Sequence, residues 1–108
     1  MKFGGTSVAS ADRVKRVARL IKSHSKDNEI VAVVSAIKGV TDDLIQISES
    51  VRKGSKTDVE KFIDRFKKLH MDMAKTSMTK VKTRKELRNV LNVVIKELED
   101  VLNGMVLL

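Results

Sequence analysis

A run of apolar, mostly β-branched residues places the tightest limit on the fold. Residues 29–35 read Glu-Ile-Val-Ala-Val-Val-Ser, so five consecutive apolar residues occur without any alternation. Such a strand is typical of parallel sheets, which are covered on both faces, whereas a strand with one exposed face alternates apolar and polar residues. The run predicts a central strand that is buried on both faces, and with it an α/β fold.

A glycine turn followed by a helix precedes this strand. Residues 1–3 predict the end of a short strand, which runs into the turn formed by residues 4–7, Gly-Gly-Thr-Ser. Ser10 then suits the N-cap of a helix whose apolar residues recur at helical spacing, at Val14, Val17, Ala18 and Ile21. The order strand, turn, helix, strand is that of parallel strands joined by a crossover helix.

A second turn and helix follow the apolar run. The turn covers residues 36–40 and contains Gly39, and Thr41 can cap the next helix, with Leu44, Ile47 and Val51 on one face. We therefore expect residues 1–54 to form a β-α-β-α unit.

From residue 55 onwards the pattern is helical throughout. Two capping boxes, Thr57-x-x-Glu60 and Thr83-x-x-Glu86, predict the starts of two helices, and Gly104 predicts the end of the second. We expect residues 55–108 to form an antiparallel helical pair joined by the polar residues 76–82. The predicted apolar faces are Val59, Phe62, Ile63, Phe66, Leu69 and Met73, and Leu87, Val90, Leu91, Val94, Leu98 and Leu102.

Composition excludes several classes of protein. The 108 residues contain no Cys, which excludes disulfides, iron–sulfur clusters and a Cys nucleophile. The formal net charge is +8, but each half of the chain contributes equally, and there is no Tyr or Trp on which bases could stack. We predict no nucleic-acid partner, no membrane segment, no metal site of the chain's own, and a cytoplasmic location. A non-enzymatic basic helical binding module remains an alternative.

The first glycine turn has the composition of an anion site. Backbone N–H groups at the carboxyl end of a strand, beside a helix N-terminus, bind phosphates in α/β folds. Gly4 and Gly5 let a phosphate approach the backbone, and Lys2, Thr6 and Ser7 offer further donors. Neither G-x-x-x-x-G-K-[ST] nor G-x-G-x-x-G is present, and a Gly-Gly turn alone is equally compatible with an ordinary tight turn.

The second turn adds two hydroxyl groups. Ser35 ends the apolar strand and Thr41 starts the next helix, so both would face the same carboxyl edge as the first turn. A polar ligand at that edge would contact both turns.

Two segments together resemble a known family. Residues 2–8, Lys-Phe-Gly-Gly-Thr-Ser-Val, and residues 33–42, Val-Val-Ser-Ala-Ile-Lys-Gly-Val-Thr-Asp, resemble the N-terminal part of the aspartate kinases, within the amino acid kinase family. The fold implied is the N-terminal part of a three-layer α/β/α domain, and the helical pair matches an insertion after the second turn.

The resemblance implies ATP-dependent phosphorylation of the side-chain carboxylate of L-aspartate, with Mg²⁺. It assigns Lys2, Phe3, Gly4 and Gly5 to ATP and Lys2 to the transferring phosphoryl group, and it assigns Ser35 and Thr41 to aspartate. Thr6 and Ser7 are included as candidate substrate contacts. Other amino acid kinases, acting for example on glutamate or acetylglutamate, are the enzymatic alternative.

The resemblance also predicts what the chain does not supply. Further aspartate contacts, the adenosine pocket and the regulatory domains lie outside the matching stretch, and the apolar end, residues 105–108, suggests a continuation. We expect an incomplete catalytic domain that is inactive alone, and a parent protein that is a homo-oligomer whose catalytic remainder and regulatory domains are partners of this segment.

Overall fold

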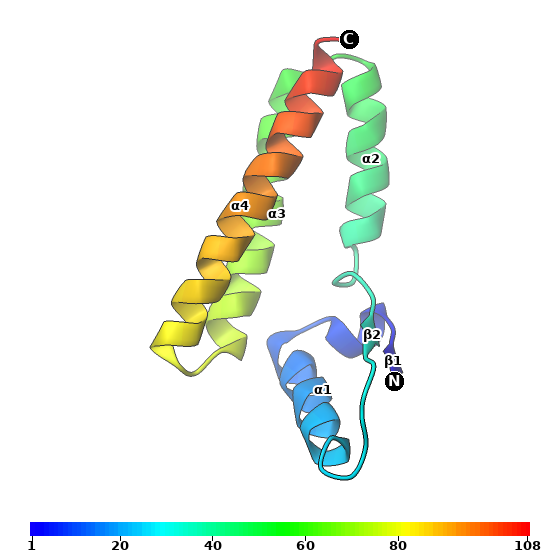
Figure 1. The fold of residues 1–108 in the computed structure, drawn as a ribbon. Coiled ribbons are helices and arrows are strands. Elements are labelled where there is room, and N and C mark those ends of the chain that lie inside the picture. Colours follow the sequence, from blue (N-terminus) through cyan, green and yellow to red (C-terminus); the bar gives the residue numbers. More distant parts are fainter. The chain divides into compact units, whose positions relative to one another are not determined.

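The computed structural model describes residues 1–108, which divide into two compact units, Met1–Thr41 and Asp42–Leu108 (Figure 1). The chain is mostly helical, with a single pair of short parallel strands. The predicted organisation, with a β-α-β-α unit over residues 1–54 and a helical insertion over residues 55–108 of an incomplete catalytic domain, stays a prediction.

The first unit contains two strands in parallel register. β1 (Lys2–Phe3) pairs with β2 (Val33–Val34), with Phe3 opposite Val34. The N–H of Val33 donates to the carbonyl of Met1 at 2.7 Å, and the N–H of Ser35 donates to the carbonyl of Phe3 at 2.9 Å. The short first strand and its parallel partner are therefore as predicted.

The prediction of a long, doubly buried strand over residues 29–35 is wrong for this structure. Only Val33 and Val34 are in a strand, and they are 57% and 60% exposed, while Val31 is 79% exposed. A strand is buried on both faces only when layers of helix cover both sides. The sheet here has only two strands. Helix α1 (Ala11–His24) packs on the short 3₁₀ helix η1 (Gly5–Val8) instead, so the apolar run remains largely uncovered.

Helix α1 (Ala11–His24) begins where the sequence predicts. Ser10 is its N-cap, and the Ser10 hydroxyl accepts a hydrogen bond from the N–H of Arg13 at 3.3 Å. Val17 is buried on the apolar face. The preceding turn forms η1 (Gly5–Val8), with Val8 buried.

The second unit is built from helices. α2 (Val40–Arg52), α3 (Lys56–Ser77) and α4 (Val81–Val106) follow one another, and α3 and α4 lie side by side in opposite directions (Figure 1). The buried cluster of this unit draws on all three helices. Its members are Ile47, Val51, Val59, Phe62, Ile63, Ile95 and Leu102. The expected helical pair is present, and α2 contributes Ile47 and Val51 to its core.

Three predicted caps are wrong. Thr41 lies inside the first turn of α2, because that helix begins at Val40. Ser55, rather than Thr57, caps α3, because its hydroxyl accepts from the N–H of Asp58 at 3.3 Å. Thr83 lies within α4, whose N-cap position is held by Lys80 without any side-chain hydrogen bond.

The predicted end of α4 at Gly104 is also wrong. A terminating glycine adopts positive φ, and Gly104 does not, so the helix continues to Val106. Val106 packs against the buried cluster, and this contact favours the additional residues in helical conformation.

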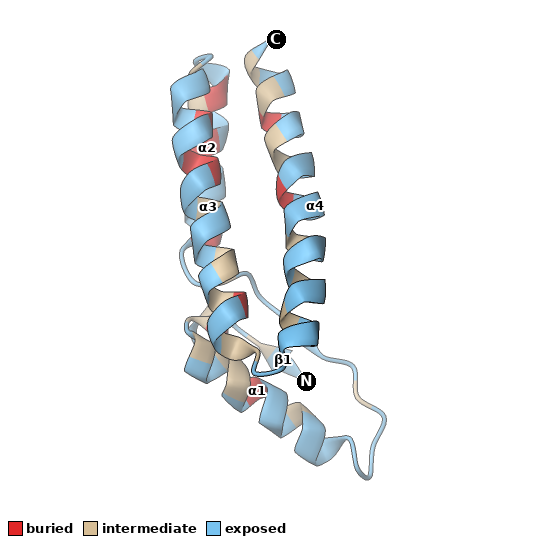
Figure 2. Ribbon diagram, turned by 90° about the vertical axis from the view of Figure 1, so that its left-hand side faces the viewer, coloured by how far each residue is buried: buried red, intermediate tan, exposed pale blue.

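The buried face of α4 differs in part from the predicted one. Val90 and Val94 are 59% and 50% exposed, whereas Ile95 is 5% exposed and packs with Leu102 in the cluster. The apolar residues of α4 span a wider arc than the neighbouring helices cover, so one edge of that arc faces solvent (Figure 2). Leu69, predicted to be buried on α3, is likewise 37% exposed.

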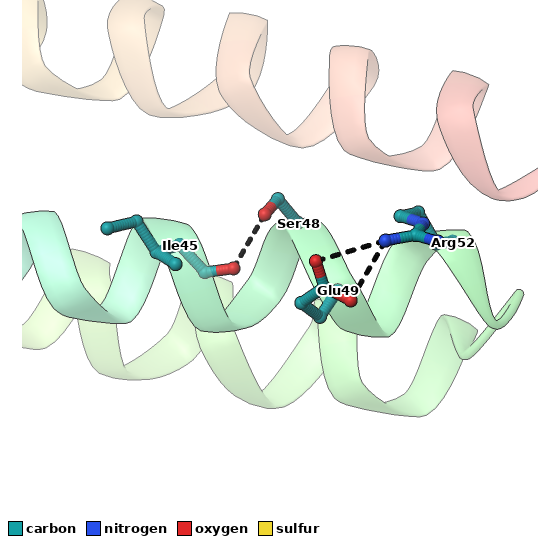
Figure 3. A network of polar contacts seen from close by, with 4 residues as sticks. All are labelled: Ile45, Ser48, Glu49 and Arg52. Carbon is teal, nitrogen blue, oxygen red and sulfur yellow. Dashed lines mark hydrogen bonds and ion pairs between the residues drawn. The ribbon is translucent and has the colours of Figure 1, made fainter.

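The exposed side of α2 carries short-range polar contacts (Figure 3). The Arg52 guanidinium contacts both carboxylate oxygens of Glu49 at 3.2 Å, and the Ser48 hydroxyl donates to the carbonyl of Ile45 at 2.6 Å. Glu49 is thereby engaged within its own helix. None of the helices has the length and apolar character needed to cross a membrane.

Candidate active site

The parallel pairing of β1 and β2 places the two sequence motifs at one edge of the sheet. Gly4 follows the last residue of β1, and Ser35 follows the last residue of β2. Because parallel strands end at the same edge, both turns leave the sheet on the same side. This edge is the candidate site.

Gly5 lies beside the second turn. A Cβ atom added to Gly5 would lie 3.5 Å from the carbonyl oxygen of Ala36 and 3.8 Å from Oγ of Ser35. The Cα atom of Lys38 would be 3.9 Å away. The backbone at Gly5 therefore lies close to the Ser35–Ala36 turn, with ordinary van der Waals room for a Cβ atom between them. That a ligand contacts both turns stays a prediction.

Gly4 has no neighbour on its open side. An added Cβ would meet no atom within 4 Å, and the backbone is extended, with φ −75° and ψ 175°. Gly39 differs, because its φ of +90° is one that side-chain-bearing residues rarely adopt. The second turn needs its glycine for its backbone, and the first turn does not.

The first turn is held by two hydrogen bonds. The N–H of Ser7 donates to the carbonyl of Gly4 at 3.0 Å, and Nη1 of Arg13 donates to the carbonyl of Thr6 at 2.7 Å. The side chains of Thr6 and Ser7 remain exposed. Sequence reasoning missed Arg13, because an Arg on the polar side of a helix carries no signal that it reaches back to the preceding turn.

A hollow of about 350 Å³ adjoins this turn. Its lining combines aromatic, hydroxyl and guanidinium groups from the first turn and α1. The residues are Phe3, Thr6, Ser7, Arg13, Arg16, Val17 and Leu20. Two guanidinium groups beside two hydroxyls make this surface suitable for an anionic ligand.

Two of the predicted site residues make no polar contact with the turns. The side chains of Lys2 and Thr41 are exposed and make no hydrogen bond or ion pair. Lys2 stands on β1 opposite Val33, next to the first turn, while Thr41 lies one residue into α2. Both are accessible to a ligand.

Carboxylates and imidazoles do not gather anywhere in the chain. No group of three or more His, Asp or Glu side chains has an arrangement that could hold a metal ion. The larger hollow of about 470 Å³ is lined by residues of α2 and α3, and its lining mixes acidic and basic exposed residues such as Asp58, Lys61 and Asp64.

Comparison with known proteins identifies the family. The model of the amino acid kinase family matches residues 1–105. The chain belongs to the amino acid kinase family. This assignment accounts for the glycine turn at the carboxyl end of a parallel strand, and it agrees with a mixed α/β fold.

Several relatives of the chain are proteins named aspartokinase. One from Rickettsia felis is 49% identical over 51 residues, which are 46% of this chain and 13% of the relative. One from Rickettsia bellii is 42% identical over 57 residues, 52% of this chain and 14% of the relative. One from Mycobacterium tuberculosis H37Rv is 45% identical over 51 residues, 46% of this chain and 12% of the relative. The matched stretches thus span about an eighth of the length of these relatives.

Proposed function

We propose that this chain is the N-terminal part of the catalytic domain of an aspartate kinase. The activity is transfer of the γ-phosphoryl group of ATP to the side-chain carboxylate of L-aspartate. The observation that supports the proposal is the parallel register of β1 with β2, because the two motifs follow these strands at one sheet edge. The names of the relatives support aspartate over glutamate or acetylglutamate as the acceptor.

The first turn is suited to the phosphates of ATP. Gly4 leaves the backbone open on one side, so a phosphate can approach the N–H groups of the turn without meeting a side chain. Lys2, the first residue of β1, is an exposed cation with a long flexible side chain that can neutralise the transferring group. Phe3, which is half-buried and lines the hollow, limits the access of water.

The second turn is suited to the acceptor. Ser35 and Thr41 present exposed hydroxyls at or near the same edge, and either can donate to a carboxylate. Thr6 and Ser7 offer two more hydroxyls from the first turn. We assign aspartate to this set of hydroxyl groups.

The proposed phosphoryl transfer does not need a general base. The aspartate carboxylate is ionised at neutral pH, so it attacks the γ-phosphorus without a general base. The transition state is loose, and catalysis rests on positioning and on neutralising charge on the phosphoryl oxygens. Lys2 supplies that charge, and the N–H groups of the turn hold the oxygens in place.

Mg²⁺, when bound with ATP, would neutralise part of the charge of the phosphates. The residues present do not form a metal cage of their own, so the fit to the ion is through ATP rather than through this chain. We derive no step through the ion. Nucleotide use follows from kinase chemistry, and the cytoplasm, where ATP and free amino acids are plentiful, is the expected location.

A chimera tests the proposed function. The stretch of this chain that matches the Rickettsia felis aspartokinase replaces the corresponding 51 residues of that enzyme. We expect aspartate-dependent formation of acyl phosphate, trapped with hydroxylamine, and its loss in Lys2→Ala. A folded chimera that is inactive with aspartate, or one that prefers glutamate, would overturn the assignment.

We also predict that the 108-residue chain alone is inactive. Its matched stretches cover only 13% and 12% of two of the relatives, so most of their residues have no counterpart here. Incubation with ATP, Mg²⁺ and aspartate is expected to yield no hydroxamate above a Lys2→Ala control. Trapped acyl phosphate above that control contradicts the prediction.

We further expect the parent protein to contain the remaining layers of a three-layer α/β/α domain, to carry regulatory domains and to be a homo-oligomer. The exposed β2 and its flanking apolar residues support the first point, because such a strand is normally covered on both faces.

A further inference from the structure

The positive charge of the second unit is concentrated at one end of the α3–α4 pair. Residues 75–88 contain six Lys or Arg residues and one acidic residue, Glu86. The unit's other residues are close to neutral in total, so this end accounts for its excess of positive charge. We call it the basic hairpin end. Its cations are Lys75, Lys80, Lys82, Arg84, Lys85 and Arg88.

None of these cations forms an ion pair in the structure. The ion pairs of the structure join Arg52 to Glu49 and Lys96 to Glu99 and Asp100, and none involves the basic hairpin end. The first turn of α4 also contains no acidic residue, although acidic residues are favoured there. Cations four apart on one helix, such as Arg84 and Arg88, destabilise it unless an anion lies between them.

Three of the cations surround one hollow. A cavity of about 140 Å³ lies between the end of α3 and the start of α4 and is lined by Met71, Asp72, Ala74, Lys75, Arg84 and Arg88. A space of this size can admit a small tetrahedral oxyanion. Asp72 is the only acidic group in the lining, against three cations.

The Arg84 side chain is held in place at this cavity. One of its terminal nitrogens, Nη2, donates to the carbonyl of Met78 at 2.7 Å, which spans the loop between the helices. Its Nε is buried and has no hydrogen-bond partner. A guanidinium fixed in this way still has donors to spare, and its planar arrangement of N–H groups matches phosphate oxygens.

We propose that the cavity between Lys75, Arg84 and Arg88 binds a phosphate group of a small molecule. This site lies in the second unit and is separate from the first glycine turn in residues and in ligand contacts. The ligand class is a phosphate monoester or free inorganic phosphate, which share the tetrahedral dianion that two guanidinium groups and an ammonium group recognise.

Amide NMR of the 108-residue chain tests the proposal. Inorganic phosphate and a phosphate monoester, glucose 6-phosphate, are titrated separately at constant ionic strength, with chloride as the reference anion. We expect saturable shifts at the amides of residues 75–88, with a dissociation constant on the order of 1 mM. Tighter binding of the monoester would identify an organic phosphate as the ligand, and equal binding would identify phosphate itself.

The matched variants separate the cavity from general charge. Arg84→Gln/Arg88→Gln is expected to weaken binding about tenfold, since charge-assisted hydrogen bonds are lost. Arg52→Gln/Arg65→Gln removes the same charge from exposed sites elsewhere in the unit and is expected to leave binding unchanged. If the double variant fails to fold, Lys75→Gln replaces it in the experiment, because the Lys75 side chain makes no hydrogen bond that the fold would lose.

Several results would overturn the proposal. If both double variants weakened phosphate binding equally, the binding would depend on the overall positive charge and not on the cavity. Shifts confined to residues 4–7 would place phosphate at the first turn alone, which concerns the proposed kinase function and not this cavity. Binding of an RNA oligomer at the hairpin end without saturable binding of either small phosphate would instead make this end a nucleic-acid surface.

Discussion

Gly4 and Gly39 show that two glycines in neighbouring turns can be required for different reasons. Gly39 has φ +90°, so its backbone is strained for any residue with a Cβ. Gly4 has an ordinary extended backbone and open space where a Cβ would stand. The fold therefore requires glycine at 39 but not at 4, and for Gly4 we propose that a ligand approaches the backbone there.

This contrast leads to a prediction about paired variants. Gly39→Ala is expected to destabilise the 108-residue chain by about 1–2 kcal/mol. Gly4→Ala is expected to leave its stability unchanged or raise it by about 0.5 kcal/mol, because the unfolded chain loses freedom. Chemical denaturation followed by circular dichroism measures both.

In the chimera, the same Gly4→Ala change is expected to raise the KM for ATP about tenfold, which is about 1.4 kcal/mol of lost binding. An unchanged KM would show that the open side of Gly4 does not face the phosphates.

Arg13 is the residue that connects the first turn to α1. Its guanidinium donates to the carbonyl of Thr6 at 2.7 Å. Because the contact is exposed, we expect Arg13→Gln to cost only about 0.5–1 kcal/mol of stability. The local effect should be larger, with faster hydrogen exchange at the N–H of Ser7, and Arg13→Lys should restore part of the protection. Equal exchange rates in wild type and Arg13→Gln would exclude this role.

At the scale of elements, adjacent residues on α4 have opposite environments. Ile95 is 5% exposed within the buried cluster, and Val94 is 50% exposed. We expect Ile95→Ala to destabilise the chain by about 2–4 kcal/mol through loss of apolar contact and a residual cavity. Val94→Ala should cost less than about 1 kcal/mol. Thermal denaturation of the two variants checks this, and similar costs would mean that α4 packs on a different face.

The elements also show where sequence reasoning succeeds. The hydroxyl of Ser10 caps α1 as predicted, because a cap depends on a few adjacent residues. The capping-box patterns predict that α3 and α4 start at Thr57 and Thr83, but the N-cap positions are Ser55 and Lys80. Ser55 offers an equivalent hydroxyl two residues earlier, and α4 begins without a side-chain cap. Local patterns of similar strength compete, and packing selects among them.

At the scale of the whole molecule, apolar side chains remain exposed in both units. Val33 and Val34 are exposed in the first unit, and Val90, Val94 and Val101 are exposed on α4. The two-stranded sheet also leaves strand edges unpaired. Surfaces of this kind favour association between copies or with a covering partner.

We therefore predict that the 108-residue chain self-associates at high concentration. Light scattering should show a mass that rises with protein concentration, and Val94→Glu/Val101→Glu should lower it, because charges on the exposed stripe of α4 disfavour its burial. A constant monomer mass up to millimolar concentration would contradict the prediction.

By itself, the sequence determined the motifs, their order and most helices, because these depend on residues close together in the chain. It predicted one site from Lys2, Gly4, Gly5 and Ser35, which stays a prediction, and the register of β1 with β2 brings the two turns to one edge. Only the tertiary structure decided that the apolar run of residues 29–35 is largely uncovered, that Arg13 supports the first turn, and which face of α4 is buried. Burial and long side-chain contacts depend on what lies opposite in space, and a local pattern does not record that.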